Sequence, residues 1–369
     1  MSLSDKEIIK RLEALAAKVV TQVMRGRPPY IEIPVRSFSN TIWDEKRKIL
    51  RLGPAKARRE FLDSKEVKKF MQTLLMLSLI VTARREGDYP TIRDLYYMGK
   101  HTITYRDING RSRKEETWNE QRESNSIIED IEVAVGILRE DMGIMHDAKG
   151  KMVGNVIIRS KGHIIDCSKM GIGAYAIPPN PDRLEIIKVE ADYVLVIEKD
   201  AIFERLNQEE FWKRENCVLI TGKGQPDRAT RRMVRRLWEE FGLPIYVLTD
   251  ADPYGWYIYS VYRSGSISLS YESEKLACPE VRFIGVAASD IEAYKIPKNY
   301  VIIATDRDLK RANEMMKYPW FQSEAWQHEL KLFLKRKEKV EIEALSGHGF
   351  KFLSNVYIPE KIEKRLWII

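Results

Sequence analysis

The sequence predicts an α/β protein in two parts, a helical front half and a rear half built on a mainly parallel sheet covered by helices. In the front half, apolar residues recur at intervals of three and four, which is the period of an amphipathic helix. Beyond residue 190, short β-branched runs alternate with helical segments, an order typical of a parallel sheet with helices on both faces. At 369 residues the chain exceeds the size at which one core keeps growing, so we expect more than one domain.

The net charge and the cysteines indicate which kinds of partner and which cellular compartment to expect. The formal net charge of +8 is compatible with a polyanionic partner such as nucleic acid. Cys167, Cys217 and Cys278 have neither the spacing of a zinc site nor the pairing of a secreted disulfide framework. No stretch approaches the apolar length that a membrane span needs. We therefore expect a cytoplasmic protein.

Residues 1–63 are expected to form an extension with one amphipathic helix, capped by Asp5, and short strands at 31–35 and 49–52. The apolar stripe of the helix consists of Ile8, Leu12, Leu15, Val19 and Val23. Such a piece lacks a core of its own, so it should dock either on the body of the chain or on a partner.

Residues 64–158 predict three helices followed by a hairpin, the order of a winged helix-turn-helix domain. Ser64 is the expected N-cap of the first helix, which Gly87 ends. Thr91 with Asp94 and Ser126 with Glu129 have the spacing of capping boxes that open the next two helices. The expected hairpin joins residues 143–146 to 151–158. Winged-helix domains often bind duplex DNA.

Residues 159–369 are expected to form the sheet domain with C-terminal helical elements, although 159–190 are hard to assign. The expected strands are 193–197, 217–220, 245–249, 281–285 and 300–304. The expected helices are 200–206, 227–241, 254–263, 309–317 and 323–337.

Two of these strands end in acidic residues: Glu198 follows one, and Asp250 and Asp252 follow another. Open α/β sheets place their sites at such strand ends. Alternate residues leaving a strand project to one side, so both aspartates can face one ion while the glutamate approaches from a neighbouring strand. Ligands that are all oxygen suit Mg²⁺. The alternative is that these acids only cap helices.

A glycine-containing loop and a basic helix follow the strand at 217–220. The loop, residues 221–226, could receive a phosphate on its backbone amides, or it is only a tight turn. Basic residues on or beside the helix could track a DNA backbone, or they form a solvated face. These candidate DNA-binding residues are Lys223, Arg228, Arg231, Arg232 and Arg235, with Arg236 beside them.

The second helix of the front half carries Arg93, Tyr96 and Tyr97. Tyrosine, with an ordinary pKa of about 10, needs a nearby cation or metal to become a nucleophile. Arg93 lies one helical turn before Tyr97 and could supply that charge or hold a phosphate. The alternative is that the tyrosine pair packs in a core or an interface.

In combination these motifs resemble the family of topoisomerase VI A subunits and the meiotic double-strand-break transesterases. The resemblance covers nearly the whole chain. Its most specific parts are residues 93–97, the strand end around Glu198, and residues 222–231 and 249–255.

The resemblance implies a type IIB DNA topoisomerase subunit, with a winged-helix domain at 64–158 and a Toprim domain at 159–369. It implies that Tyr97 is the nucleophile, that Glu198, Asp250 and Asp252 bind Mg²⁺, and that cleavage leaves 5′-phosphotyrosyl links. It also implies a homodimer in which each tyrosine serves the partner's metal site, joined by an ATPase B subunit in an A2B2 complex that relaxes and decatenates DNA. The N-terminal helix is our candidate dock for the B subunit, and the match favours an archaeal, nucleoid-associated enzyme over a meiotic factor.

Two other functions are compatible with parts of the sequence. A Toprim nuclease or primase-like phosphotransferase would keep the carboxylates and use water in place of tyrosine. A winged-helix regulator would bind DNA without chemistry, and its acids would be structural.

Overall fold

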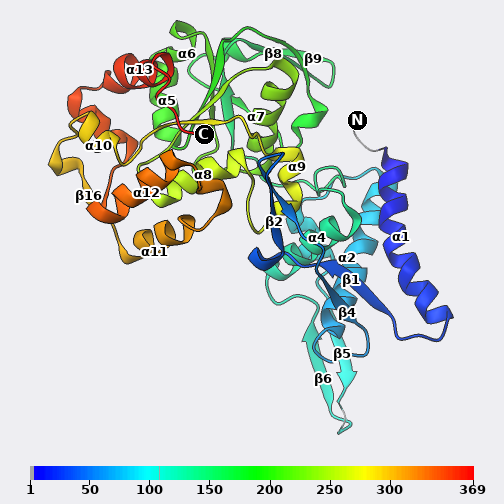
Figure 1. The fold of residues 1–369 in the computed structure, drawn as a ribbon. Helices are drawn as coiled ribbons and strands as arrows, with labels where there is room; N and C mark the ends of the chain where they lie inside the picture. The colour runs from blue at the N-terminus through cyan, green and yellow to red at the C-terminus, as the bar shows by residue number, and fades with distance from the viewer. Residues whose placement is uncertain (1–3, 108) are drawn as a thin grey trace. The chain divides into compact units, whose positions relative to one another are not determined.

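The computed structural model describes residues 4–107 and 109–369 and divides the chain into two compact units. Unit 1 comprises Met1–Thr41 and Leu52–Asp147, and unit 2 comprises Ile42–Arg51 and Ala148–Ile369. Figure 1 shows the elements of both units. Most of the described part of the predicted extension, residues 4–63, belongs to unit 1.

Unit 1 is mainly helical. Its helices are α1 (Asp5–Met24), α2 (Val67–Glu86), α3 (Ile92–Met98) and α4 (Gln121–Val135). Two antiparallel ribbons join them, one pairing β1 (Tyr30–Pro34) with β4 (Lys56–Glu60), the other pairing β5 (Thr102–Arg106) with β6 (Ser112–Glu116).

The helix starts in unit 1 follow the capping predictions only in part. The Thr91–Asp94 capping box at α3 is confirmed, with both reciprocal hydrogen bonds present. Ser64 does not cap α2, which begins at Val67 after Glu66 without a side-chain cap. Asp5 is the first residue of α1, and Ser4 is the cap whose hydroxyl accepts from the Glu7 amide.

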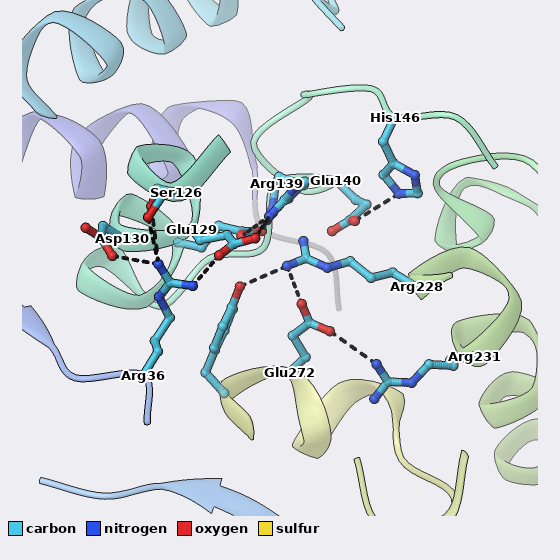
Figure 2. A network of polar contacts seen from close by, with 12 residues as sticks. Arg36, Ser126, Glu129, Asp130, Arg139, Glu140, His146, Arg228, Arg231 and Glu272 are labelled. Atoms are coloured by element: carbon cyan, nitrogen blue, oxygen red, sulfur yellow. Dashed lines mark hydrogen bonds and ion pairs between the residues drawn. The ribbon is translucent and has the colours of Figure 1, made fainter. Parts of the chain in front are cut away.

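The predicted helix start at Ser126 is wrong, because α4 already begins at Gln121. Ser126 and Glu129, the residues that suggested a capping box, take part in a network of polar contacts instead. Figure 2 shows Arg36 contacting Glu129, Asp130 and the Ser126 side chain. Arg59 of β4 also pairs with Asp130, at 2.7 Å. These pairs fasten the β1–β4 ribbon to α4.

The predicted hairpin at 143–158 is also wrong. β7 (Lys151–Val153) pairs with strands of unit 2, and β8 (Val156–Ser160) pairs with β9 (His163–Asp166) and β11 (Glu185–Val189). The hairpin of unit 1 is β5–β6, which lies before α4 (Figure 1). β5 alternates polar residues with Ile103 and Tyr105, but β6 has no apolar residue, so only one half of the hairpin carries the pattern that predicts a strand.

The apolar stripe of α1 packs inside unit 1. Ile8, Leu12, Leu15 and Val19 are buried in one cluster with residues of α2 and α4. Val23, the last residue of the predicted stripe, is 56% exposed. Of the two alternatives for the extension, docking on the body of the chain is therefore confirmed for most of the helix.

The main sheet of unit 2 has the strand order β10-β7-β13-β12-β14-β15. β12 (Tyr193–Ile197) lies parallel to β13 (Cys217–Thr221) and β14 (Ile245–Leu248), and β15 (Arg282–Gly285) continues the parallel set. β7 and β10 (Tyr175–Ala176) add an antiparallel edge. The predicted mainly parallel sheet is confirmed.

One predicted strand of that sheet lies elsewhere. β16 (Ile302–Ile303) pairs with β17 (Glu338–Lys339) as a separate two-stranded ribbon. Its isoleucines are exposed, so the apolar character of this run reflects local pairing rather than a place in the core. A further two-stranded ribbon pairs β2 (Thr41–Asp44) with β3 (Ile49–Leu52), and Leu50 joins the larger core of unit 2.

Helices cover both faces of the main sheet. Alternate residues of β12 enter different cores, Val194 and Val196 on one face and Leu195 and Ile197 on the other. The helices of this unit are α5 (Asp200–Gln208), α6 (Phe211–Arg214), α7 (Arg228–Phe241), α8 (Pro253–Arg263), α9 (Ser273–Leu276), α10 (Asp290–Ala293), α11 (Asp306–Met315), α12 (Glu324–Arg336) and α13 (Ile358–Glu363). No helix in the described part of the chain combines the length and apolar character that crossing a bilayer requires.

Truncating the buried stripe of α1 tests whether it belongs to the core. Leu12→Ala is expected to lower the stability of unit 1 by about 2–4 kcal/mol, because a fully buried leucine leaves a cavity. Hydrogen exchange of α2 and α4 amides in the full chain measures this. Val23→Ala on the same helix is the control and should change protection by less than about 0.5 kcal/mol. Equal effects of the two variants would show that the stripe is not core.

Candidate active site

The structure brings Glu198 and Asp250 into direct contact at the carboxyl end of the sheet. Glu198 directly follows β12, Asp250 lies just beyond β14, and these strands are parallel neighbours. The Glu198 amide donates to the Leu248 carbonyl at 3.0 Å, which continues the ladder past the last strand residue. The Asp250 amide then donates to Glu198 Oε2, also at 3.0 Å. The predicted meeting of acids from neighbouring strands is therefore present for this pair.

Each of the three predicted acids has one carboxylate oxygen held by a backbone amide. The Asp250 amide holds Glu198, the Ile342 amide holds Asp250 Oδ1 at 2.8 Å, and the Gly255 amide holds Asp252 Oδ1 at 2.7 Å. Asp252 is thus the N-cap of α8, as the capping alternative expected. A capped carboxylate keeps its second oxygen, so capping and metal binding are compatible.

Burial makes these carboxylates costly to ionise without a cation. It raises the pKa of Glu198 to about 7, and the nearby charge of Asp250 adds to the effect. Burial likewise raises the pKa of Asp250 to about 6, against which the Ile342 amide and Lys199 act. The pKa of Asp252 is also raised by burial. A divalent cation would favour the ionised forms of all three groups.

Lys199 provides the counter-charge of Asp250, whereas the charge of Lys339 acts on Asp252. Its Nζ lies 3.1 Å from Asp250 Oδ2, 3.1 Å from Glu341 and 2.7 Å from Glu343. One ammonium group thus faces three carboxylates, with Glu198 next to it in the chain. The local charge is therefore strongly negative.

Sequence reasoning missed Lys199, Glu341 and Glu343. Lys199 is adjacent to Glu198 and could have been found as a cation beside an acid-ended strand. The two glutamates carry no such signal, because they lie far along the chain from Asp250. They reach the site through an isolated bridge between Ala251 and Val340.

The donor set fits a hard divalent cation in its chemistry, since its members are carboxylates with an excess of negative charge, although Asp250 Oδ2 also pairs with Lys199. The carboxylates are not already collected around one point, and no three ligating side chains converge on an ion position within the described residues. The direct contact is between Glu198 and Asp250, while Asp252 interacts with them through its charge. Mg²⁺ would complete its shell with waters.

The two tyrosines of α3 have different environments. Tyr96 is 8% exposed and its hydroxyl accepts from Lys100 Nζ at 3.3 Å, whereas Tyr97 is 60% exposed. Their rings meet edge to face, with centroids 5.1 Å apart. Arg93 is exposed one turn before Tyr97. Of the two phenols, Tyr97 is the one that a macromolecular substrate can reach from solvent.

The loop at 221–226 is partly satisfied within the chain. The Lys223 amide donates to Thr221 Oγ1 at 3.1 Å, and the Gly224 amide donates to the Glu198 carbonyl at 2.8 Å. Lys223 Nζ pairs with Asp200 at 3.2 Å. These bonds tie the loop to the acid-bearing strand end, in line with the alternative of a structured turn. Phosphate binding there stays a prediction.

The arginines of α7 are engaged inside unit 2. Figure 2 shows Arg228 and Arg231 both reaching Glu272, which is fully buried. Arg231 is itself only 2% exposed, and burial lowers its pKa. Arg232 pairs with Asp182 and Glu239, Arg235 with Glu239, and Arg236 with Glu240. The α7 arginines therefore do not form the solvated face that was the alternative to DNA binding, and DNA binding by them stays a prediction.

Comparisons with known proteins define the class. A family model of the Toprim domain found in the topoisomerase 6 A subunit and in Spo11 matches residues 193–362. A model described as type IIB DNA topoisomerase matches residues 68–144, and an all-beta domain of the DNA topoisomerase VI alpha subunit matches residues 149–190. The matched domains are thus those of a type IIB DNA topoisomerase chain.

Full-length relatives narrow the class further. The A subunit of type 2 DNA topoisomerase 6 from Hyperthermus butylicus is 57% identical over 98% of this chain and 97% of its own length. The protein of the same name from Pyrococcus horikoshii is 39% identical, covering 98% of this chain and 96% of its own. The DNA topoisomerase 6 A subunit of Arabidopsis thaliana is 33% identical over 97% of this chain and 80% of its own. The chain belongs to the family of topoisomerase VI A subunits.

Neutralising one acid should weaken divalent binding. Asp250→Asn is expected to reduce Mg²⁺ affinity at least about tenfold, because it removes one charged oxygen ligand. Calorimetric titration of the full chain measures this. Asp192→Asn, a position just before β12 at the other end of that strand, is the matched control. Equal affinity in both variants would exclude Asp250 as a ligand.

Mg²⁺ affinity should also depend on pH in a defined direction. Protons compete with the cation below the pKa values of about 7 for Glu198 and about 6 for Asp250. Affinity is therefore expected to be full above pH 8 and to fall as the pH drops through 7 and then 6. Titrations between pH 5.5 and 8.5 test this. A flat profile over that range would contradict the role of these groups.

Proposed function

We propose that this chain cuts and reseals duplex DNA as the A subunit of a type IIB topoisomerase, with Tyr97 as nucleophile and Glu198, Asp250 and Asp252 as ligands of Mg²⁺. The main support is the strand-end cluster of buried carboxylates, each with one oxygen anchored to the backbone. That arrangement is suited to a cation shared with a phosphate. Membership of the topoisomerase VI family supplies the reaction class.

The reaction divides into two reversible steps. Tyr97 gives up its phenolic proton to water, and its oxygen forms a bond to a backbone phosphorus while the bond from that phosphorus to the 3′ oxygen breaks. The electron pair of the broken bond leaves with the 3′ oxygen, which takes up a proton from water, and the 5′ phosphate stays on tyrosine. Resealing reverses these changes. Because one phosphoester replaces another, no external energy is needed to rejoin the strand.

Protein groups supply orientation and charge for this exchange. Arg93, exposed one turn before Tyr97, is placed to contact a phosphate oxygen or to favour the phenolate. Bound Mg²⁺ would stabilise charge on the phosphoryl oxygens and on the leaving oxygen. The amides that hold Glu198, Asp250 and Asp252 keep the carboxylates oriented when the cation leaves.

A homodimer accounts for cutting both strands. Tyr97 belongs to unit 1 and the carboxylates belong to unit 2. Two chains related by a two-fold axis would match the symmetry of duplex DNA, each contributing a tyrosine to its partner's carboxylates. This pairing is carried over from the family resemblance.

ATP-driven strand passage needs a second polypeptide, which we propose is the B subunit that the names of the relatives imply. The sequence carries no apparent nucleotide-hydrolysis motif of its own. Most of the α1 stripe packs in unit 1, but Val20, Val23 and Met24 at its C-terminal end are exposed. We propose this end of α1 as the contact for the B subunit.

A covalent-adduct assay tests the nucleophile. Wild-type chain, its B subunit, Mg²⁺, ATP and end-labelled duplex are incubated and trapped with detergent. Tyr97→Phe is expected to abolish adducts, because phenylalanine has no oxygen to attack phosphorus. Tyr96→Phe, one residue away but buried, is the matched control and should retain them.

Label position and variant behaviour together separate the candidate functions. Label is expected on fragments that carry a 5′ link to protein. Cleavage without any adduct would favour the water-using nuclease, and adducts that persist in Tyr97→Phe but vanish in Tyr96→Phe would move the nucleophile by one residue.

A further inference from the structure

The β5–β6 hairpin presents one face of hydroxyl and basic side chains. Directly opposed residues of an antiparallel pair lie on the same face. One face therefore holds Thr102, Thr104, Arg106, Ser112, Lys114 and Glu116, and all but Glu116 are exposed. Glu116, the only acid among them, accepts a hydrogen bond from Thr102 Oγ1 at 2.7 Å. Hydroxyls and cations in this arrangement are the groups that contact nucleic-acid phosphates.

The two cations on this face are available to a ligand. No ion pair or hydrogen bond to the Arg106 or Lys114 side chain occurs among the described residues. On the opposite face, Arg113 pairs with Asp107 at 3.0 Å and Glu115 pairs with Lys68 of α2 at 2.8 Å. The charges of the opposite face are thus matched within the unit, whereas those of the hydroxyl face are not.

The base of the hairpin is joined rigidly to the helix that carries Tyr97. Thr117 Oγ1 donates to the Gly99 carbonyl at 2.6 Å and accepts from the His101 amide at 2.9 Å. Gln72 of α2 donates to the Thr117 carbonyl. Gly99 packs so closely on the buried Trp118 ring that a Cβ at this position would lie 2.7 Å from it. Hairpin and α3 should therefore move together.

We propose that the β5–β6 hairpin is a DNA-binding arm, whose hydroxyl face contacts the phosphates of the duplex beside the cleavage point and holds the duplex in register with Tyr97. This rests on the proposed function for the position of cleavage. Five-residue strands span about 17 Å, roughly half a turn of B-DNA. A two-stranded ribbon also has dimensions that a groove admits.

The chemistry of the face favours a polyanion over a protein partner. Ile103 and Tyr105, the large apolar residues of β5, lie on the other face. Protein interfaces have apolar centres with few charges, whereas DNA interfaces are polar and positive. The hydroxyl face has the second composition.

The arm is tested by removing its two unmatched cations in the full chain. Binding of a fluorescein-labelled duplex to wild type and to Arg106→Gln/Lys114→Gln is measured by anisotropy over a range of salt concentrations. Each lost phosphate contact reduces the slope of log affinity against log salt by about 0.9, so the double variant should lose nearly two units. Affinity at low salt should fall about tenfold or more.

The control removes the same charge elsewhere. Lys331→Gln/Lys335→Gln changes two exposed lysines of α12 in unit 2 and should leave the slope within about 0.3 of wild type. An unchanged slope in the hairpin variant would overturn the proposal, as would equal losses in both double variants. Weakened binding of the B subunit with unchanged DNA binding would overturn it too, by making the arm a protein contact.

Failure of the arm and failure of the proposed function are distinguishable. Tyr97→Phe should bind the duplex with the wild-type salt slope, because the phenol supplies no cation. At saturating DNA the hairpin variant should still form covalent adducts. If the hairpin variant kept the wild-type salt slope while covalent adducts still formed, the arm alone would be refuted. If the hairpin variant lost the expected part of its salt slope but no adduct formed on Tyr97, the assigned nucleophile alone would be refuted.

Discussion

The active half of this protein depends on keeping carboxylates close together and buried at the end of a parallel sheet. The Asp250 amide donates to the Glu198 carboxylate, and the negative charge of Asp250 opposes the ionisation of Glu198. Burial raises both pKa values, because it penalises the charged forms. Lys199 is shared with two further glutamates, so it offsets only part of this charge. A divalent cation would offset the remaining negative charge.

The fold maintains this arrangement through backbone contacts rather than through long side chains. β12 and β14 are neighbouring parallel strands, so the residues that follow them start from adjacent positions. The chain returns through the Ala251–Val340 bridge, which brings the Ile342 amide to Asp250. In unit 1 the short capped helix α3 buries Tyr96 and exposes Tyr97. Unit 1 thus exposes a phenol, and unit 2 holds a group of buried carboxylates.

Local signals in the sequence were sufficient for some of these features. The strand β12 and its terminal Glu198 were predictable because a β-branched run followed by an acid is local information, and so was the Thr91–Asp94 capping box. The β5–β6 hairpin was missed because β6 has no apolar residue, and the alternation in β5 is limited to Ile103 and Tyr105. Glu341 and Glu343 could not be found either, since only tertiary pairing brings them to Lys199. Burial of the α7 arginines likewise depends on Glu272, which is distant in sequence.

Our central claim is that a phenol from unit 1 of one chain and carboxylates from unit 2 of another act on the same phosphorus. The most direct test combines two inactive chains, Tyr97→Phe and Asp250→Asn, in a heterodimer purified through two different tags, with the B subunit, Mg²⁺, ATP and supercoiled plasmid. Shared sites would contain one complete pair, the tyrosine of the second chain with the carboxylates of the first, so the account predicts cleavage of one strand only and nicked circles. Neither chain alone should produce them. If the heterodimer were as inactive as its parent homodimers, the claim of sites shared between chains would be contradicted.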